Sequence, residues 1–294
     1  MKALKKGDRI GVVSPSSFIE NQKQIDKAIK YFESLGLKPV LGKHITDKWR
    51  YMGGTPENRA KDVMDFYKDK SIKAIFCTRG GAGSEYLLDL LDYECIKKNL
   101  KPLAGFSDTT FLQNAILTKS GGVNFSGFLM VYDFKKSGLD TLINHSLQDL
   151  LFGKKVSCRG GICINKGKAE GILVGGCLSV LSYLCGTKYF PDLKGKILIL
   201  EDIGLKTYQL DLLLQQLKRQ KNFNKLKGII FGGFIDSIVI DPEDGSVEEV
   251  IDTFCKDLKM PILKNFPYSH SKSRIVVPLG AKVKLDAAKC LLEF

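Results

Sequence analysis

Ser107 occupies a position where a serine could act as a nucleophile. It lies in AGFSDTT (residues 104–110), after a short apolar stretch and directly before Asp108. A nucleophilic serine can occupy a sharp strand-to-helix turn of this kind. The alternative is a helix cap, because Ser and Asp side chains accept hydrogen bonds from backbone N–H groups at helix starts. Taken by itself, the heptapeptide favours the cap.

The candidates for a base and for an orienting carboxylate lie in the second half of the chain. The sequence contains three histidines, and we expect His44 and His145 to be surface residues. His270 lies in a Ser/Lys-rich loop before an apolar strand, and such loops often carry functional side chains, although a single loop histidine is more often solvated. Glu201 ends the apolar run KILILE, at the strand edge where open α/β sheets bind ligands. The alternative for Glu201, favoured for one acidic residue alone, is that the strand simply enters solvent there.

The segment RGGAG (residues 79–83) is a glycine-rich turn between a predicted strand and a predicted helix. Turns of this type present several backbone N–H groups to an anion or to a developing oxyanion. A dinucleotide-binding motif would require a third glycine where Tyr86 stands, and the GK[ST] of a P-loop is missing. A tight packing turn is an equally good interpretation of the motif alone.

Ser107, Glu201 and His270 follow one another in the chain order of an α/β-hydrolase triad. The GxSxG motif of that fold is broken, however, because Thr109 occupies the last glycine position. This disfavours a standard α/β-hydrolase but not a convergent triad on another fold.

Strands and helices alternate along the chain, which predicts βαβ units around a mainly parallel sheet. Helices are expected after Ile25, after the Thr55–Pro56 cap, over SEYLLDLLD (residues 84–92) and from Tyr208. The runs RIVVP and KVKLD near the end are expected to pair with each other. Lys, Gly and turn signals predict a linker over residues 151–167 between domains at residues 1–150 and 168–294.

The composition is that of a globular protein rather than a nucleic-acid-binding protein. The chain has 294 residues, 44% hydrophobic and 26% charged, and a formal net charge of +13. The basic residues are 38 lysines and seven arginines, scattered along the chain. Because readers of nucleic acids cluster arginine on one face, the charge indicates compositional bias. DNA binding remains an alternative and predicts a steep dependence of affinity on salt.

The eight cysteines show no CxxC pair and no histidine at metal-ligand spacing, so no metal site is expected. Reduced thiols favour a cytoplasmic protein over a secreted one. The first residues contain only a short apolar run interrupted by glycine, so we expect neither a signal peptide nor a membrane span.

A series of motifs resembles the LD-carboxypeptidase family of serine peptidases over nearly the whole chain. This family includes murein tetrapeptide carboxypeptidases and microcin C self-immunity peptidases. The motifs are, in order, GVVSPSS, YMGGTPENRAKDV, IFCTRGGAGSEYLL, AGFSDTT, VNFSGFLM, ILVGGCLSVLSYLCGTKYFPDLKGKILILEDI and PYSH…VPLGA. Each motif is weak alone, whereas the ordered series is specific.

The resemblance implies a triad of Ser107 as nucleophile, Glu201 as orienting carboxylate and His270 as base. It implies an oxyanion hole of the Gly81 and Asp108 N–H groups, in an active site between an N-terminal and a C-terminal α/β domain. The implied reaction removes D-alanine from a murein tetrapeptide during peptidoglycan recycling or turnover, without metal or cofactor. The expected partner is a muropeptide, with no nucleic acid and no membrane span, and a homodimer is compatible with the sequence.

Two other functions stay open at this point. Within the family, the alternative is an immunity-type peptidase that cleaves a peptidyl or aminoacyl nucleotide. Outside it, the alternative is a non-catalytic anion- or nucleotide-binding module built on RGGAG. The sequence also departs from the family pattern near the implied pocket, which leaves the exact specificity open; the departures are Ala82, Phe128, Cys177, Leu205 and Ser269.

Overall fold

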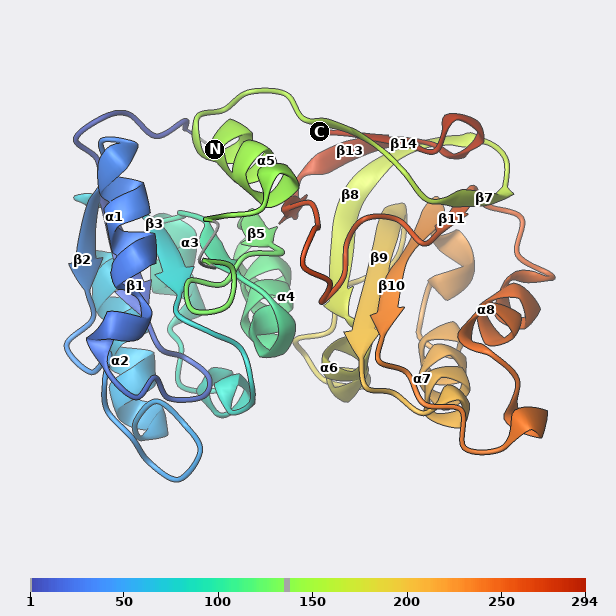
Figure 1. Cartoon of the computed structure of the whole chain (residues 1–294), viewed down its shortest axis with the longest axis horizontal. Helices are drawn as coiled ribbons and strands as arrows, with labels where there is room; N and C mark the ends of the chain where they lie inside the picture. Colours follow the sequence, from blue (N-terminus) through green and yellow to red (C-terminus); the bar gives the residue numbers. More distant parts are fainter. Residues whose placement is uncertain (1, 135–137) are drawn as a thin grey trace. The chain divides into compact units, whose positions relative to one another are not determined.

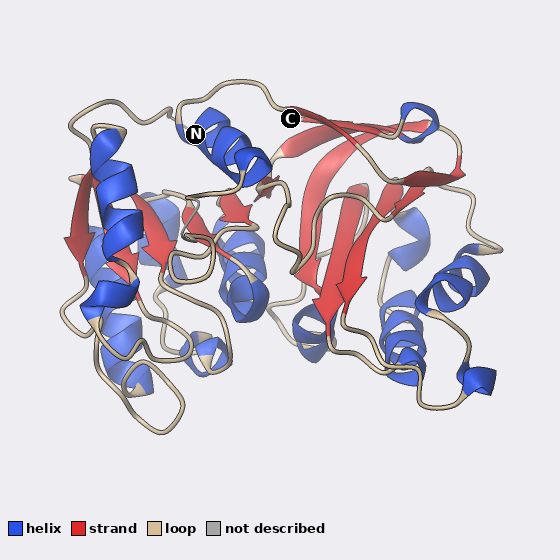
Figure 2. Ribbon diagram, viewed as in Figure 1, coloured by secondary structure: helices blue, strands red, loops and turns tan. Residues whose placement is uncertain are grey.

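The computed structural model describes residues 2–134 and 138–294 (Figure 1). The chain divides into two compact units. Unit 1 consists of Met1–Lys154 and Val276–Gly280, and unit 2 of Lys155–Ile275 and Ala281–Phe294. Each unit holds one β-sheet together with several helices (Figure 2), which confirms the predicted α/β class.

Unit 1 is built on a six-stranded sheet in the order β12-β5-β4-β3-β1-β2. Five strands run parallel, and only β12 pairs antiparallel, with β5. This confirms the mainly parallel sheet expected for the first domain. The strands are β1 (Arg9–Val13), β2 (Lys38–Leu41), β3 (Ile72–Cys77), β4 (Leu103–Gly105), β5 (Asn124–Ser126) and β12 (Val277–Leu279). The helices are α1 (Asp26–Ser34), α2 (Pro56–Lys68), α3 (Tyr93–Lys98), α4 (Thr110–Ser120) and α5 (Thr141–Leu151).

Local sequence signals explain several elements of unit 1. The Thr55 side chain accepts a hydrogen bond from the N–H of Asn58, and Pro56 fills the first turn of α2, where a missing N–H removes no helical bond. Strands β1 and β3 are buried along almost their whole length. Continuous burial of this kind is typical of central strands in a parallel sheet that is covered on both faces.

The two edges of the unit 1 sheet carry different segments. At the carboxyl edge, β3 ends at Cys77 and leads into the 79–83 loop, while β4 ends at Gly105 and leads to Ser107. Because β3 and β4 are parallel neighbours, these two segments leave the sheet side by side. The amino edge is formed by the segments that precede β1, β3, β4 and β5.

Unit 2 is built on an eight-stranded sheet in the order β6-β14-β13-β8-β9-β10-β11-β7. Its four central strands, β8 to β11, are parallel, and the flanking strands are antiparallel. The strands are β6 (Ser157–Arg159), β7 (Ile162–Asn165), β8 (Lys168–Cys177), β9 (Lys196–Ile203), β10 (Gly228–Ile235), β11 (Ile262–Lys264), β13 (Lys282–Asp286) and β14 (Leu291–Glu293). The helices are α6 (Leu178–Tyr183), α7 (Thr207–Lys218) and α8 (Val247–Cys255).

The chain passes from unit 1 to unit 2 after Lys154 and returns to unit 1 once, through residues 276–280. Residues 151–167 contain the end of α5 and the strands β6 and β7. No helix among residues 2–134 and 138–294 combines the length and the hydrophobicity that a membrane-spanning helix requires.

Two predictions about elements were wrong. The helix expected over residues 84–92 is a short 3-10 helix, Ser84–Leu87, because the Asp92 side chain accepts the N–H of Cys95 and starts a separate helix there. The expected pairing of RIVVP with KVKLD does not occur. Instead β12 pairs with β5 in unit 1, whereas β13 pairs with β8 and β14 in unit 2. Gly280, in a positive-φ conformation (+91°), separates β12 from β13.

Candidate active site

Ser107 lies on a strained turn and does not cap a helix. It follows β4 and begins a 3-10 helix, Ser107–Thr109, that leads into α4, and its side chain caps neither helix. Its φ of +63° is in the left-handed region, where a residue other than glycine costs about 1–3 kcal/mol. The cap interpretation of this serine is therefore wrong. Ser107 is half-buried at the carboxyl edge of a parallel sheet, on a strained turn, and nucleophilic serines can occupy turns of this kind.

The 79–83 loop lies directly against this serine. A Cβ on Gly80 would lie 2.9 Å from the Ser107 Cβ, so only glycine allows the loop backbone to come this close. Gly81 has a φ of +111°, and a Cβ there would clash with the Ser17 side chain. The N–H of Ala82 donates to Ser17 Oγ at 3.1 Å, which fixes the loop. Ala82 itself is exposed.

Asp108 connects the serine turn to the segment after the 79–83 loop. Its buried carboxylate accepts the N–H of Ser84 at 3.0 Å, and the Ser84 hydroxyl donates to the Asp108 carbonyl oxygen at 2.8 Å. Burial raises the pKa of the Asp108 carboxyl, while the hydrogen bonds from Ser84 oppose that shift. As the second residue of a helix, Asp108 also has a backbone N–H without an intrahelical acceptor. Unit 1 thus brings three of the sequence-predicted residues together: Ser107, Gly81 and Asp108.

Arg59 is a supporting residue that the sequence analysis missed. Its side chain lies on α2, is 1% exposed, and donates hydrogen bonds to three carbonyl oxygens from separate loops, those of Pro15, Gly54 and Gly83. Gly83 ends the 79–83 loop, so this guanidinium group holds the loop in place. Helical spacing could have predicted that Arg59 is buried, because it falls four residues before Val63 on the buried face of the helix.

Replacing Arg59 with methionine should lower the free energy of unfolding by about 3 kcal/mol, because three buried carbonyl oxygens lose their donor. Chemical denaturation measures this change. Lys61→Met is the matched control, since Lys61 lies on the exposed side of the same helix and pairs there with Asp65. The control should leave stability nearly unchanged. Similar losses in both variants would show that Arg59 does not hold the loops.

Unit 2 contains a carboxylate–imidazole pair. Glu201 lies near the end of β9 with a fully buried side chain, and its Oε2 atom lies 2.6 Å from Nδ1 of His270. The His270 side chain is 15% exposed. A carboxylate on Nδ1 selects the tautomer with a proton on that nitrogen, so proton exchange with a nucleophile must use Nε2. This is the arrangement of an oriented general base.

The loop that carries His270 is held by its backbone. The carbonyl oxygen of Tyr268 accepts the N–H of Gly233 at 3.1 Å, and the N–H of Ile275 donates to Pro267 at 2.7 Å. A Cβ on Gly232 would lie within 1.8 Å of the Tyr268 oxygen, so glycine is required there for β10 to approach the loop. These contacts bring His270 to Glu201 although 69 residues separate them in the sequence.

Burial raises the pKa of the Glu201 carboxyl, and the hydrogen bond to His270 is the strongest influence in the opposite direction. Its second oxygen, Oε1, has no hydrogen-bond partner within the described part of the chain. Cys177 of β8 stands opposite Glu201 in the sheet register. Burial and the nearby carboxylate raise the pKa of the Cys177 thiol, so this thiol stays protonated and is a poor nucleophile.

The remaining candidates fall outside these two clusters. His145 is exposed on α5, as expected, whereas His44 is half-buried and its Nδ1 lies 2.8 Å from an oxygen of Asp47. Phe128, one of the departures from the family pattern, is fully buried and packs against the rings of Phe32 and Phe76. It is a core residue of unit 1. Across residues 2–134 and 138–294, no group of three His, Cys, Asp or Glu side chains is arranged to hold a metal ion.

Comparison with known proteins identifies relatives of this chain. Sequence models of the N-terminal and C-terminal domains of LD-carboxypeptidases match residues 10–127 and 170–285. The chain is 33% identical, over 293 residues, to a protein of Bacillus subtilis (strain 168) named probable murein peptide carboxypeptidase, with 98% of this chain and 92% of the relative covered.

Two further similarities cover nearly the whole chain. The murein tetrapeptide carboxypeptidase of Pseudomonas aeruginosa is 28% identical over 292 residues, with 95% of this chain and 93% of the relative covered. The crystal structure of an MccF-like protein from Bacillus anthracis str. Ames matches with a TM-score of 0.89 and 29% identity, and covers 100% of this chain and 98% of that one. Both units therefore resemble the corresponding domains of LD-carboxypeptidases and MccF-like proteins.

Proposed function

Because the chain belongs to the LD-carboxypeptidase family, we propose that it hydrolyses the L,D bond before the terminal D-alanine of a murein tetrapeptide. The observation that carries this proposal is the buried Glu201 carboxylate 2.6 Å from the His270 imidazole. The names of the relatives from Bacillus subtilis and Pseudomonas aeruginosa support the class of substrate.

In the proposed mechanism, Ser107 Oγ attacks the carbonyl carbon of the L-configured residue, and Nε2 of His270 takes its proton. Glu201 stabilises the imidazolium ion that results. The tetrahedral intermediate collapses to an acyl-enzyme as His270 gives the proton to the departing amine of D-alanine. Water, activated in turn by His270, then releases the tripeptide and restores Ser107.

We propose that the N–H groups of Gly81 and Asp108 stabilise the oxyanion. Donors that are already oriented gain most when charge develops in the transition state, because no reorganisation is needed then. Two features support this role. The 79–83 loop is packed against Ser107 at Gly80, and Asp108 begins the helical turn whose N-terminal dipole favours negative charge.

We place this reaction in the cytoplasm, in peptidoglycan recycling or turnover. The supporting observation is that none of the eight cysteines forms a disulfide in the described part of the chain; four of them are buried and four half-buried. Reduced thiols are typical of a reducing compartment.

Matched tetrapeptides that differ only in configuration at the scissile bond test the proposal. We expect release of D-alanine from the L,D peptide at least about 100-fold faster than release of alanine from the D,D and L,L peptides. An inverted centre moves the carbonyl away from the oxyanion donors, and a shift of about 1 Å costs this much. Mass spectrometry of the products measures all three rates. Equal cleavage of the three peptides would leave only a general serine hydrolase.

The similarity to an MccF-like protein favours a second candidate, an immunity-type peptidase that acts on an aminoacyl or peptidyl nucleotide. An aminoacyl nucleotide analogue in the same assay distinguishes the two functions. A higher kcat/KM for the muropeptide supports the murein function, and a higher value for the nucleotide analogue supports the immunity function. Ser107→Ala should abolish either activity.

A further inference from the structure

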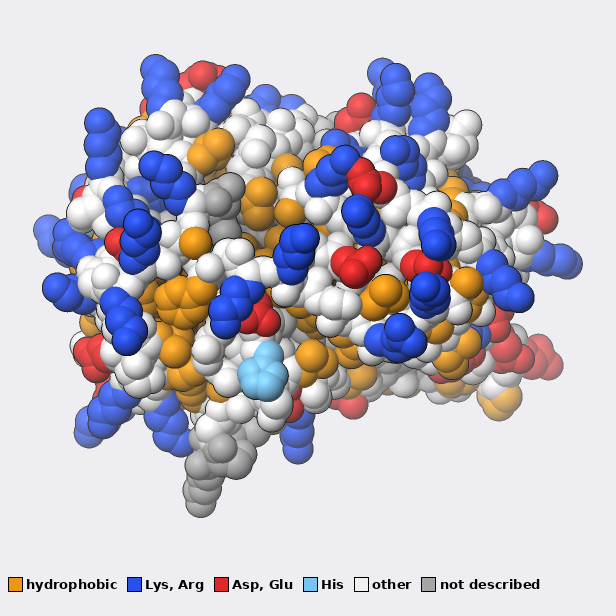
Figure 3. All heavy atoms as spheres, turned by 90° about the horizontal axis from the view of Figure 1, so that it is seen from above, with side chains coloured by type: hydrophobic (Ala, Val, Ile, Leu, Met, Phe, Trp, Pro, Cys, Tyr) orange, Lys and Arg blue, Asp and Glu red, His pale blue; other side chains and the backbone are white. Residues whose placement is uncertain are grey.

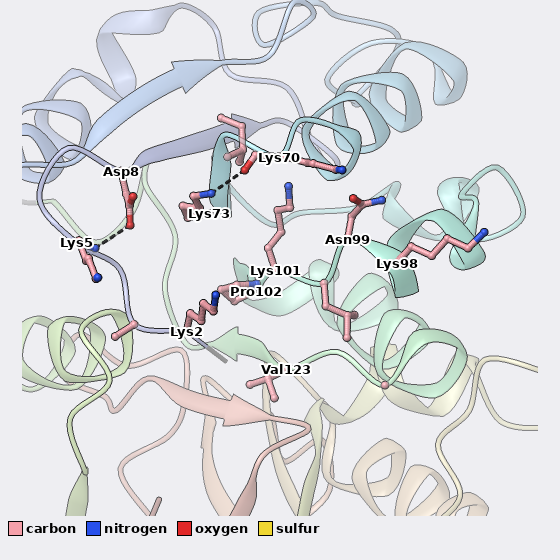
Figure 4. A pocket seen from close by; sticks show the side chains of 14 residues that line it. Lys2, Lys5, Asp8, Lys70, Lys73, Lys98, Asn99, Lys101, Pro102 and Val123 are labelled. Atoms are coloured by element: carbon pink, nitrogen blue, oxygen red, sulfur yellow. Dashed lines mark hydrogen bonds between the residues drawn. The ribbon is translucent and has the colours of Figure 1, made fainter.

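Unit 1 contains a cavity at the amino edge of its sheet, away from Ser107. The cavity has a volume of about 700 Å³ (Figure 4). Its walls come from the segments that precede β1, β3, β4 and β5, whereas Ser107 follows the carboxyl end of β4. Because these strands are parallel, the cavity and the serine lie at opposite edges of one sheet. A ligand here would not occupy the position of the nucleophile.

Six lysines line this cavity, together with a single carboxylate, that of Asp8. The lysines are Lys2, Lys5, Lys70, Lys73, Lys98 and Lys101. Figure 4 shows Lys2, Lys73 and Lys101 reaching into this region from three different segments. None of the six forms an ion pair with a carboxylate in the described part of the chain. The nearby Asp69 pairs with Arg9 instead.

The most buried of these lysines is Lys101, which is 9% exposed. Its ammonium group donates hydrogen bonds to the carbonyl oxygens of Phe66 and Asp69 at 2.8 and 2.7 Å. Burial lowers the pKa of Lys101 to about 8; the Asp69 carboxylate opposes this shift, and the neighbouring Lys73 adds to it. Six lysines and a single lining carboxylate leave an excess of positive charge in the cavity, and a bound anion would relieve the repulsion between the lysines.

A lysine-rich composition does not by itself explain this imbalance. Lys and Arg side chains are spread over the face of the molecule seen in Figure 3. A second cavity, in unit 2, is also lined by lysines, but there three lysines face three acidic residues, and Lys168 pairs with Asp286 at 3.4 Å. Of these two cavities, only the first is lined by more lysines than carboxylates.

The chemistry of the lining defines the class of ligand. Lysine ammonium groups bind phosphate as point charges, whereas planar carboxylates are better matched by arginine, which is missing from the lining. Apolar side chains also reach the cavity: Ile72, Leu100, Pro102 and Val123. Leu100 is 51% exposed and can contact an organic group. The volume falls in the range of about 300–1,000 Å³ that is typical of small-molecule sites.

We propose that this lysine cavity binds a small molecule that carries two or more adjacent phosphate groups, such as a nucleoside diphosphate or a short polyphosphate. The phosphates contact the lysines, and the organic part, where present, covers Leu100. The site is separate from the peptidase centre, so binding does not require turnover.

Titration calorimetry on the full-length protein tests this proposal, with ADP, tripolyphosphate and adenosine as probes at about 0.15 M NaCl. We expect ADP and tripolyphosphate to bind and adenosine not to bind. Tripolyphosphate binding that equals ADP binding assigns the affinity to the phosphates alone, and tighter ADP binding adds the contact at Leu100. Absence of binding by both phosphate probes would overturn the proposal.

The variant Lys70→Gln/Lys73→Gln should weaken binding of both phosphate probes by about tenfold or more, because two charge-assisted contacts to phosphate are lost. Both side chains are exposed, so folding should persist, which thermal unfolding checks. Lys23→Gln/Lys30→Gln removes two exposed charges elsewhere in unit 1 and should leave affinity within about twofold. Equal weakening by the two double variants would reduce the effect to overall charge and overturn the site.

Two further measurements separate this site from other possibilities. Muropeptide hydrolysis by Lys70→Gln/Lys73→Gln should equal that of the unmodified protein. Because binding is measured without turnover, the binding result stays interpretable even if the chain does not hydrolyse muropeptides. Single-stranded DNA is the competing class of ligand. DNA binding that depends on Lys70 and Lys73, in a protein that ignores ADP and tripolyphosphate, would assign the lysines to nucleic acid and overturn the proposal.

Discussion

Replacing Ser107 with alanine should lower kcat/KM for murein tetrapeptide by about 10⁴-fold or more, because no covalent acyl-enzyme can form without the hydroxyl. The remaining activity would come only from binding and from the oxyanion donors. Release of D-alanine, followed by mass spectrometry, measures the loss. A Ser107→Ala variant with activity close to that of the unmodified protein would remove this serine from the mechanism.

Ser107→Gly is the matched control for this experiment. Glycine adopts a φ near +63° without strain, whereas alanine retains the strain of the left-handed conformation. The glycine variant should therefore be more stable than the alanine variant by about 1 kcal/mol, and equally inactive. Inactivity in a variant that is at least as stable as the unmodified protein assigns the loss to chemistry rather than to unfolding.

Replacing Glu201 with glutamine should lower kcat/KM by about 10³–10⁴-fold. Glutamine keeps the shape of the side chain but removes the negative charge that stabilises the His270 imidazolium ion, and its amide can favour the wrong tautomer. Asp202→Asn is the matched control, because Asp202 is the adjacent buried carboxylate and accepts the N–H of Ser179 rather than an imidazole. Equal losses in the two variants would contradict a specific role for Glu201.

The unmodified protein and Glu201→Gln should also differ in how their stability depends on pH. Because burial raises the pKa of Glu201, the folded protein holds this proton more tightly than the unfolded chain does. The stability of the unmodified protein should therefore fall, relative to Glu201→Gln, as the pH rises from the unfolded-state pKa through the raised folded-state pKa. Urea denaturation at several pH values above about 4.3, the ordinary pKa of glutamate, measures this difference. A rise in the stability of the unmodified protein relative to Glu201→Gln over this range would contradict the raised pKa.

Features set by neighbouring residues were predictable from the sequence. The Thr55 cap and the helix after Ser107 both form as expected, because each depends on hydrogen bonds or apolar spacing within a few residues. The parallel sheet of unit 1 followed from the alternation of strands and helices. The candidates Ser107, Glu201 and His270 could also be named in advance, from residue type and from the family resemblance.

Features set by distant residues were not predictable in this way. The pairing of β12 with β5 depends on which sheet edge is open to residues 277–279, and the run RIVVP carries no information about that edge. The sequence shows Arg59 only as a residue of a helix, whereas its hydrogen bonds to three loop carbonyl oxygens exist only in the folded structure. Charges from three separate segments likewise meet in the lysine cavity only after the sheet has formed.

The two candidate clusters show the same division. The sequence by itself determined that a serine follows a short apolar strand, and that a glutamate ends a buried strand. The tertiary structure decided that Ser107 lies in a left-handed conformation against Gly80, and that His270 comes within 2.6 Å of a fully buried Glu201. The physical reason is that residue type and short-range hydrogen bonds are local properties. Burial, backbone strain and contacts across 69 residues exist only when the whole sheet and its loops are packed.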